Sequence, residues 1–228
     1  MIKCAMMQPS YLPWAGYFNL IAEADIFVFL DDAQLQKNSW HNRNRILVNR
    51  LPHWITVPVN RIVLSQTINK SSIDVKKNWK QKHVKLLRQT YSKHPFSDDI
   101  LPVCDIVENH DFNSLADLNV YLIEWIVKKL GIKTKFILSS DLNISGKRTE
   151  RIINILEKLK ADVYLSPQGA AEYLQLDDFP NKTSINLTFQ SFEPKPYDQH
   201  RHDKFESHLS IVDVVANIGW ENTKRYIT

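Results

Sequence analysis

An unusual density of side chains that can do chemistry lies between residues 31 and 45. Asp31 and Asp32 open this stretch, and Arg43 and Arg45 close it. A carboxylate pair can hold a divalent cation or a sugar hydroxyl, or accept a proton as a general base, and two arginines can hold a phosphate through their planar guanidinium groups. The other candidate substrate-binding residues of the stretch are Gln34, Lys37, Trp40 and Asn44. A solvated loop whose charges pair with one another is the alternative, and the sequence leaves both open.

A second group of polar and aromatic side chains precedes the first predicted helix. Residues 2–7 and 26–30 are apolar enough for buried strands, and residues 14–24 repeat apolar positions at helical spacing. In such a β-loop-α-β unit, the loop after the first strand lies at the carboxyl edge of the sheet, where α/β proteins bind ligands. The candidate substrate-binding residues here are Gln8, Tyr11 and Trp14.

Later strand-turn-helix units predict further loops at the same edge. Strands are expected at 135–138, 162–165 and 185–189. Lys147 and Arg148 lie at the start of a predicted helix, where free backbone N–H groups and the helix dipole favour the binding of a phosphate. The same residues are equally consistent with an ordinary helix start whose two cations are exposed to solvent. A turn of small residues after the second of these strands adds two candidate substrate-binding residues, Ser166 and Gly169.

The middle of the chain predicts a hairpin and several helices. Asp74 is expected to cap the first of these helices, with Val75 on its buried face. The hairpin is expected from strands at 46–48 and 54–59, the helices at 74–93, 97–109 and 114–130, and a last helix at about 210–218.

These elements together predict one α/β domain over residues 1–228. We expect a Rossmann-like, three-layer, parallel-rich sheet with an inserted hairpin and a helical insertion at about 74–131. If the sheet is parallel, the loops that begin near Gln8, Asp31, Ser139 and Ser166 converge on one cleft.

Composition excludes several classes of protein. A net charge of +4 and a pI of about 8.9 give a mild basic excess that suits anionic small molecules, whereas a dedicated nucleic-acid binder usually carries a denser basic patch. No apolar run approaches the roughly 20 residues of a membrane span. The N-terminus lacks the charged and apolar regions of a signal peptide, so we expect a cytoplasmic protein. Cys4 and Cys104 lack metal-site or redox spacing and are expected as reduced core thiols.

No residue stands out as a covalent nucleophile or as part of a metal site. No serine lies in a G-x-S-x-G elbow, and neither cysteine has a positioned histidine near it in the sequence. His200 and His202 are two histidines without a third ligand, so we predict no protein-bound metal. The sequence names no cofactor, and Mg²⁺ is expected only as the companion of a nucleotide.

Three motifs together resemble the WbqC-like family. They are the segment from Gln8 to Phe18, the pattern Asp-Asp-x-Gln-x-x-Lys-x-x-Trp-x-x-Arg-Asn-Arg at 31–45, and Tyr197-x-Gln199 ahead of 209–213. The resemblance implies a role in bacterial surface-polysaccharide clusters, including those for O-antigen and lipopolysaccharide, with transfer of glycine or a similar aminoacyl group onto a sugar. It also adds Tyr197 and Gln199 to the candidate substrate-binding residues.

Under this resemblance the chain is expected to be a transferase. Arg43 and Arg45, with Lys147 and Arg148, would hold phosphate. Trp40 or Tyr11 would stack on a sugar or base. Asp31 or Asp32 would be the general base. The expected partners are a nucleotide-linked or lipid-linked sugar and an aminoacyl donor, with no nucleic acid unless the donor is a charged tRNA; the sequence does not fix the oligomeric state.

Two alternatives remain open on the sequence. The first unit is also similar to HIGH-type nucleotidyltransferases and adenylate-forming ligases, with Trp14-Ala15-Gly16-Tyr17 at the motif position and both histidines absent. This similarity implies ATP-dependent formation of an acyl-adenylate. The other alternative is a noncatalytic nucleotide-sugar-binding protein of the same pathway.

Overall fold

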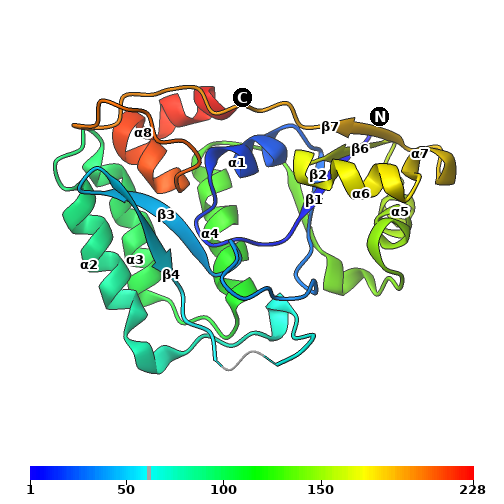
Figure 1. Ribbon diagram of the computed structural model, residues 1–228, viewed down its shortest axis with the longest axis horizontal. Helices are drawn as coiled ribbons and strands as arrows, with labels where there is room; N and C mark the ends of the chain where they lie inside the picture. The colour runs from blue at the N-terminus through cyan, green and yellow to red at the C-terminus, as the bar shows by residue number, and fades with distance from the viewer. Residues whose placement is uncertain (61–62) are drawn as a thin grey trace.

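A parallel sheet of five strands forms the centre of the fold. The computed structural model describes residues 1–60 and 63–228, and Figure 1 shows the sheet edge-on between its helices. The strands are β1 (Lys3–Met7), β2 (Ile26–Phe29), β5 (Lys135–Leu138), β6 (Val163–Ser166) and β7 (Asn186–Phe189). Their order is β5-β2-β1-β6-β7, and every neighbouring pair is parallel. From β1 the chain adds β2 and β5 on one side and then β6 and β7 on the other, so the strand order reverses between β1 and β6. In sheets of this kind, ligands bind in the crevice outside the carboxyl ends of the strands at that point.

Helices cover both faces of the sheet, because alternate residues of each strand point to opposite sides. Ala5, Phe27 and Phe29 belong to the core under one layer of helices, and Cys4 and Val28 belong to the core under the other. The first layer contains α1 (Ala15–Ala22), α4 (Leu115–Lys129) and α8 (Ile211–Ile227). The second layer contains α5 (Arg148–Lys158), α6 (Ala171–Leu176) and α7 (Phe179–Lys182). The predicted three-layer α/β fold is confirmed.

The predicted hairpin is present, but its turn is tighter than expected. β3 (Arg43–Val48) and β4 (Leu51–Thr56) are antiparallel, with Leu47 opposite Pro52. Only Asn49 and Arg50 connect them, and both have positive φ angles, 49° and 68°, as the twist of a two-residue hairpin turn requires. The expected strand limits, 46–48 and 54–59, were therefore wrong. Pro52 lies inside β4, because a proline is tolerated in a two-stranded ribbon that has free edges.

Two further helices pack with the hairpin at the end of the molecule away from α5 to α7 (Figure 1). They are α2 (Trp79–Tyr91) and α3 (Leu101–Asn109). Asp74 caps the short η2 (Val75–Lys77) and not α2, because Asn78 takes a left-handed conformation that separates the two. Val75 is 70% exposed, so its predicted place on a buried face was wrong. The other 3₁₀ turns are η1 (Ile68–Lys70), η3 (Ser97–Ile100), η4 (Ser139–Leu142) and η5 (Gln168–Ala170).

The C-terminal helix is longer than predicted. Ser210 caps it, and it continues past the expected end near residue 218 to Ile227 across a kink at Gly219. Gly219 has a φ of 74°, and a Cβ there would lie 2.7 Å from the ring of Phe96. Glycine is therefore required at this kink by both its backbone conformation and its neighbour.

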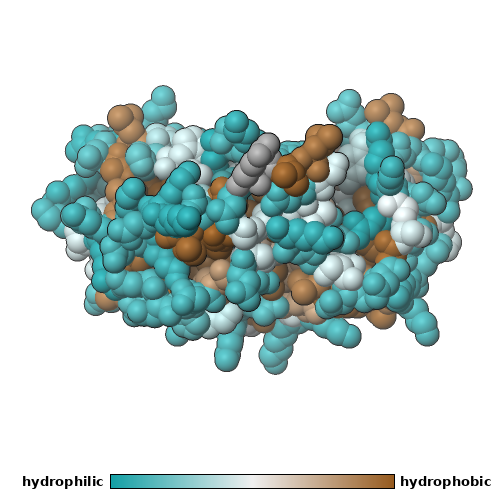
Figure 2. All heavy atoms as spheres, turned by 90° about the horizontal axis from the view of Figure 1, so that it is seen from below, coloured by the Kyte–Doolittle hydropathy of each residue, from teal (hydrophilic) through white to brown (hydrophobic). Residues whose placement is uncertain are grey.

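The two cysteines are in the state that the sequence predicts. Both cysteines are buried and free. No helix among the described residues has the length and apolar character needed to cross a membrane. Figure 2 shows a face that is mainly hydrophilic, with hydrophobic residues in separate patches.

Candidate functional site

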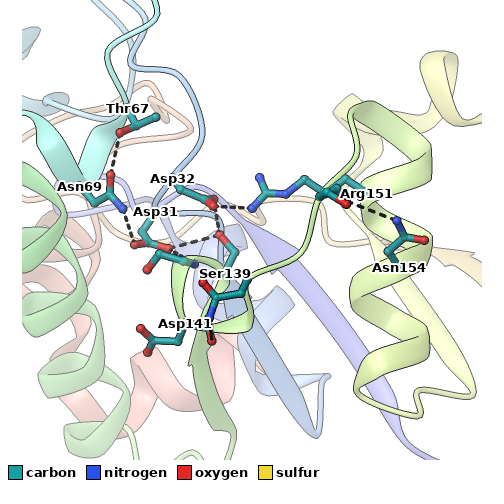
Figure 3. A network of polar contacts seen from close by, with 11 residues as sticks. Asp31, Asp32, Thr67, Asn69, Ser139, Asp141, Arg151 and Asn154 are labelled. Atoms are coloured by element: carbon teal, nitrogen blue, oxygen red, sulfur yellow. Dashed lines mark hydrogen bonds and ion pairs between the residues drawn. The ribbon is translucent and has the colours of Figure 1, made fainter.

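Asp31 cross-links three segments at the carboxyl edge of the sheet. It follows the strand β2 closely and is only 2% exposed. One carboxylate oxygen accepts hydrogen bonds from Ser139 Oγ at 3.2 Å and the Ser140 N–H at 3.0 Å, and the other accepts from Asn69 Nδ2 at 3.0 Å (Figure 3). These donors come from η4 after β5 and from η1. The buried carboxylate thus fixes both segments against the end of β2.

Asp32 extends this network to the helix α5. Its carboxylate accepts hydrogen bonds from Ser139 Oγ and from the Arg151 guanidinium (Figure 3). The side chains of the ion pair are partly shielded, with 28% of Asp32 and 19% of Arg151 exposed. Both predicted general bases are therefore held by protein donors, and they fix the geometry of the loops after β2 and β5.

A cavity of about 230 Å³ opens beside the carboxyl end of β1. It lies between the loop after β1, the start of α1, the residues before β3 and the segment before α8. The side chains that line it are largely apolar and aromatic: Met7, Ser10, Pro13, Trp14, Tyr17, Trp40, Asn44 and His208. An apolar cavity with a few polar groups, next to the point where the strand order reverses, is the usual form of a ligand site in this kind of fold.

Trp14 forms one wall of this cavity (the β1 cavity). It precedes α1, and its backbone forms a bridge to Ser210 ahead of α8. The indole lies over Gly16, where a Cβ would overlap it. It also contacts the rings of His208 and Phe192, with centroids 4.5 and 5.7 Å away. The glycine is thus the reason that the indole can lie against the first turn of the helix.

Two exposed tryptophans and an arginine extend the β1 cavity onto the surface. Trp40 and Trp54 are 46% and 40% exposed, and their ring centroids are 5.0 Å apart. The Arg43 guanidinium lies 4.2 Å from the centre of the Trp54 ring. Large exposed aromatics cost free energy in water and commonly mark binding surfaces, and a neighbouring guanidinium adds affinity for an anion. We call these three residues the aromatic platform.

Buried amides hold the loop that borders the β1 cavity. Asn44 Nδ2 donates to the carbonyls of Tyr11 and Leu12 at 3.2 and 2.7 Å, and Asn119 Nδ2 donates to the Pro9 carbonyl at 3.1 Å. Leu12 has a φ of 40°, a conformation that is strained for a branched side chain and persists only where its surroundings enforce it. The loop is therefore rigidly pre-formed. Tyr11 belongs to its support, because its ring is fully buried and its hydroxyl contacts His83 Nδ1 at 3.0 Å.

Arg45, Tyr197 and Gln199 hold the segment that carries His208. Arg45 forms an ion pair with Glu206 at 3.3 Å and donates to the Ser207 carbonyl at 3.2 Å. Gln199 exchanges two hydrogen bonds with the backbone of Glu206, each of 2.8 Å.

Tyr197 attaches the same segment to α8. Its hydroxyl donates to the fully buried Asp213 carboxylate at 2.7 Å, and the Tyr91 hydroxyl donates to that carboxylate at 3.1 Å. Burial raises the pKa of Asp213 to about 6, although both hydroxyls act in the opposite direction. Tyr197 therefore helps to position the segment that ends at His208.

His208 is the histidine among the described residues that line the β1 cavity. Its φ of 58° places it in the left-handed region, and its Nδ1 lies 2.8 Å from Ser207 Oγ. Partial burial and, to a smaller extent, the charge of Arg45 lower the pKa of His208 below its ordinary value, while Glu206 acts in the opposite direction. The ring is therefore neutral at pH 7 and can accept a proton.

The remaining predicted residues are not among those that line the β1 cavity. Arg148 pairs with Asp177 through two hydrogen bonds of 3.1 and 3.0 Å, so its guanidinium is already engaged by a carboxylate. Lys147, Lys37 and Gln34 are exposed, and the backbone of Gln34 forms a bridge to Thr67. Ser166 is buried at the end of β6, Gly169 lies in η5, and Gln8 is partly buried with its carbonyl accepting from the Tyr17 hydroxyl at 3.1 Å.

The four predicted loops share one edge of the sheet, but the described residues divide them between different cavities. The loop after β1 lines the β1 cavity, whereas Asp31 and Leu138 line a second one of about 270 Å³ next to α4. Trp14, Trp40 and Asn44 are the predicted site residues that the β1 cavity brings together. Sequence reasoning missed the site roles of Tyr17, Trp54 and His208, and for His208 the only distinguishing signal is a backbone angle that the sequence does not reveal.

The family model of the WbqC-like proteins matches residues 8–225. The chain belongs to the WbqC-like family. It is 35% identical over 228 residues to the uncharacterized protein Rv1507c of Mycobacterium tuberculosis (strain ATCC 25618 / H37Rv), covering 97% of this chain and 96% of that relative. No solved structure matches the chain. The WbqC-like match spans the loop after β1, both aspartates and most of α8, and it includes every lining residue named for the β1 cavity except Met7.

Proposed function

We propose that this WbqC-like protein is a cytoplasmic transferase that moves glycine, or a similar aminoacyl group, onto a sugar carried by a nucleotide or a lipid during synthesis of bacterial surface polysaccharide. The observation that carries the proposal is the β1 cavity with its aromatic platform. Family membership alone supports no particular reaction, so the chemistry is argued from these residues.

The β1 cavity suits one sugar ring better than a larger ligand. Its volume of about 230 Å³ is below the roughly 300–1,000 Å³ of drug-sized pockets. Trp14 and Trp40 offer apolar ring faces to the C–H groups of a sugar, and Ser10 and His208 add polar groups. The rest of a nucleotide-linked sugar would lie on the aromatic platform, with a phosphate near the Arg43 guanidinium and the base against an exposed indole.

The proposed reaction requires one proton acceptor beside the sugar. A sugar hydroxyl or amine attacks the carbonyl carbon of the activated aminoacyl group. An ester or amide bond forms, and the bond to the leaving group breaks with its electron pair. His208, which is neutral at pH 7 and lines the cavity, would accept the proton of the attacking group. Asp32, the less buried of the two aspartates, is the second candidate that the sequence offers, but it is not among the residues that line the β1 cavity.

Binding is tested by a thermal-shift screen against UDP-sugars, dTDP-sugars, ATP and glycine, with and without Mg²⁺. A nucleotide sugar at a hundredfold excess over its Kd should stabilise the fold by about 2.7 kcal/mol. Trp40→Ala should abolish that shift. Leu176→Ala is the matched control, because it also removes an exposed apolar side chain, 75% exposed on α6, and should keep the shift. Stabilisation that survives Trp40→Ala would contradict the proposed site.

Turnover is tested by incubating the sugars that bind with activated glycyl donors and measuring the product by mass spectrometry. The expected product is heavier than the acceptor by one glycyl residue. His208→Gln should slow its formation while leaving the thermal shift in place. Binding without turnover of any donor would favour the noncatalytic alternative.

The sheet order supports one other candidate, an ATP-dependent ligase that forms an acyl-adenylate. The loop after β1 and the start of α1 lie where doubly wound sheets bind nucleotides. Amino-acid-dependent exchange of labelled pyrophosphate into ATP would support this ligase. Direct transfer from an activated donor predicts no exchange.

A further inference from the structure

A third cavity, larger than the two described above, lies at the other end of the hairpin. Its volume is about 570 Å³, within the range of small-molecule sites. It is enclosed by the β3–β4 turn, the C-terminal end of α2 and the segment before Arg201. The lining residues are Leu47, Val48, Asn49, Arg50, Leu86, Gln89, Thr90, Ser92, Lys93, His94, His200 and Arg201. None of these residues lines the β1 cavity.

The charges around this cavity (the hairpin cavity) are all of one sign. Arg50, Lys93 and Arg201 come from three separate segments, and no aspartate or glutamate is among the lining residues. Within residues 1–60 and 63–228, none of these three cations has an ion pair or a side-chain hydrogen bond. Three unneutralised cations around a concave surface create a positive potential that concentrates anions.

Two histidines at the wall of the hairpin cavity carry unpaired ring nitrogens. The ring centroids of His94 and His200 are 4.8 Å apart. His94 Nδ1 and His200 Nε2 are buried, and neither has a hydrogen-bond partner in the part of the chain that the structure describes. The backbones are fixed, since the His94 N–H donates to the Tyr91 carbonyl at 2.9 Å and the His200 N–H donates to Asn217 Oδ1 at 2.7 Å. Buried polar atoms in folded proteins are rarely left unpaired, so these nitrogens indicate a missing partner.

The remaining walls define the rest of the ligand. Leu47, Val48 and Leu86 supply an apolar side, and Asn49 and Gln89 supply neutral polar groups. A ligand that fits therefore combines a strongly anionic group with an uncharged portion. Its anionic group should carry two or three charges, because three cations surround the cavity and the volume exceeds that of a single phosphate.

We propose that the hairpin cavity is a second binding site, which takes a small molecule carrying a diphosphate group. Arg50, Lys93 and Arg201 bind the phosphate oxygens, His94 and His200 donate to or accept from them, and the uncharged portion contacts the leucine side. Asn44 lines one cavity and Leu47 the other, so the two sites are a step of three residues apart along β3, about 10 Å of strand. The inference stands on its own residues and does not depend on the proposed transferase reaction.

Calorimetric titration of the full chain with sodium pyrophosphate tests the site. Pyrophosphate should bind with one-to-one stoichiometry, and Arg50→Gln, Lys93→Gln and Arg201→Gln should each weaken its Kd about tenfold, since each removes a hydrogen bond to a charged group. Lys82→Gln is the control, because it removes an exposed cation of α2, the helix whose C-terminal end borders the cavity, at a position that does not line the cavity. The three cations are exposed and unpaired, so the variants should keep the wild-type Tm.

Histidine NMR signals locate the bound pyrophosphate. The ring resonances of His94 and His200 should shift during the titration, and the resonance of His53, an exposed histidine on β4, should not. Trp40→Ala, which alters the β1 cavity, should leave the Kd for pyrophosphate unchanged. The proposal is overturned by absence of binding, by an equal loss of affinity in Lys82→Gln, or by binding that leaves both histidine resonances in place.

Discussion

A methyl group added at Gly16 should displace Trp14 and deform the β1 cavity. The new Cβ would lie 2.7 Å from Trp14 Cζ3 and closer still to Cζ2 and Cη2, so the indole cannot keep its position. The backbone of Gly16 tolerates alanine, because it has ordinary helical angles within α1. The ring end of the tryptophan is the part that can move, and it forms a wall of the cavity.

Two opposing effects set the change in stability for Gly16→Ala. Alanine in a helix is more favourable than glycine by about 0.5–1 kcal/mol. Loss of the contacts between Trp14 and the rings of His208 and Phe192 costs about 0.5–1.5 kcal/mol each. The net loss lies between about 0 and 2.5 kcal/mol, which corresponds to a fall in Tm of less than about 10 °C for a chain of this size.

The assay combines Tm with the indole N–H resonance of Trp14, assigned through Trp14→Phe. Gly169→Ala is the control for the glycine-to-alanine change, since a Cβ at Gly169 would meet no atom within 4 Å. We expect the Trp14 resonance to move in Gly16→Ala and to stay in place in Gly169→Ala. An unmoved resonance in Gly16→Ala, with Tm unchanged, would refute the reasoning about this wall.

Three other perturbations test the polar networks. Asp31→Ala leaves Asn69 Nδ2 and the Ser140 N–H without their acceptor, whereas Ser139 Oγ keeps Asp32, so the free energy of unfolding should fall by at least about 2 kcal/mol in urea titrations; a loss below about 1 kcal/mol would argue against its anchoring role. The Asp32–Arg151 pair is partly exposed, so a double-mutant cycle with alanine at both positions should give a coupling energy of only about 1 kcal/mol. The raised pKa of Asp213 means that the folded state favours the protonated carboxyl group. The stability of the wild type relative to Asp213→Asn should therefore fall as the pH rises from about 4 to about 6. A difference in stability between the two proteins that does not change with pH would contradict the raised pKa.

The sheet was predictable because its signals are local. Apolar runs of strand length at 2–7 and 26–30 flank a stretch with helical spacing, and that order alone implies parallel neighbours. The hairpin register was not predictable, because Arg50 is an uncommon residue for a positive φ angle and Pro52 argues against a strand. Tertiary packing overrode both local preferences.

The candidate site was predictable only in part. The exposed Trp40 and the cavity-lining Trp14 belong to segments whose density of functional groups drew attention to them. The role of Asp31 was hidden, because its partners Asn69 and Ser139 are 38 and 108 residues away along the chain. The sequence shows which polar side chains a loop carries. Which of them form hydrogen bonds with one another depends on how the loops pack together in the fold.

The most direct test of the central claim is an NMR titration of the indole N–H groups with UDP- and dTDP-sugars. If a sugar occupies the β1 cavity, the Trp14 and Trp40 resonances shift and saturate together. Trp125 and Trp220, which pack against each other with centroids 5.8 Å apart, serve as internal controls and should not move. Shifts confined to Trp125 and Trp220, or no shift with any nucleotide sugar, would contradict the assignment of this cavity as the sugar site.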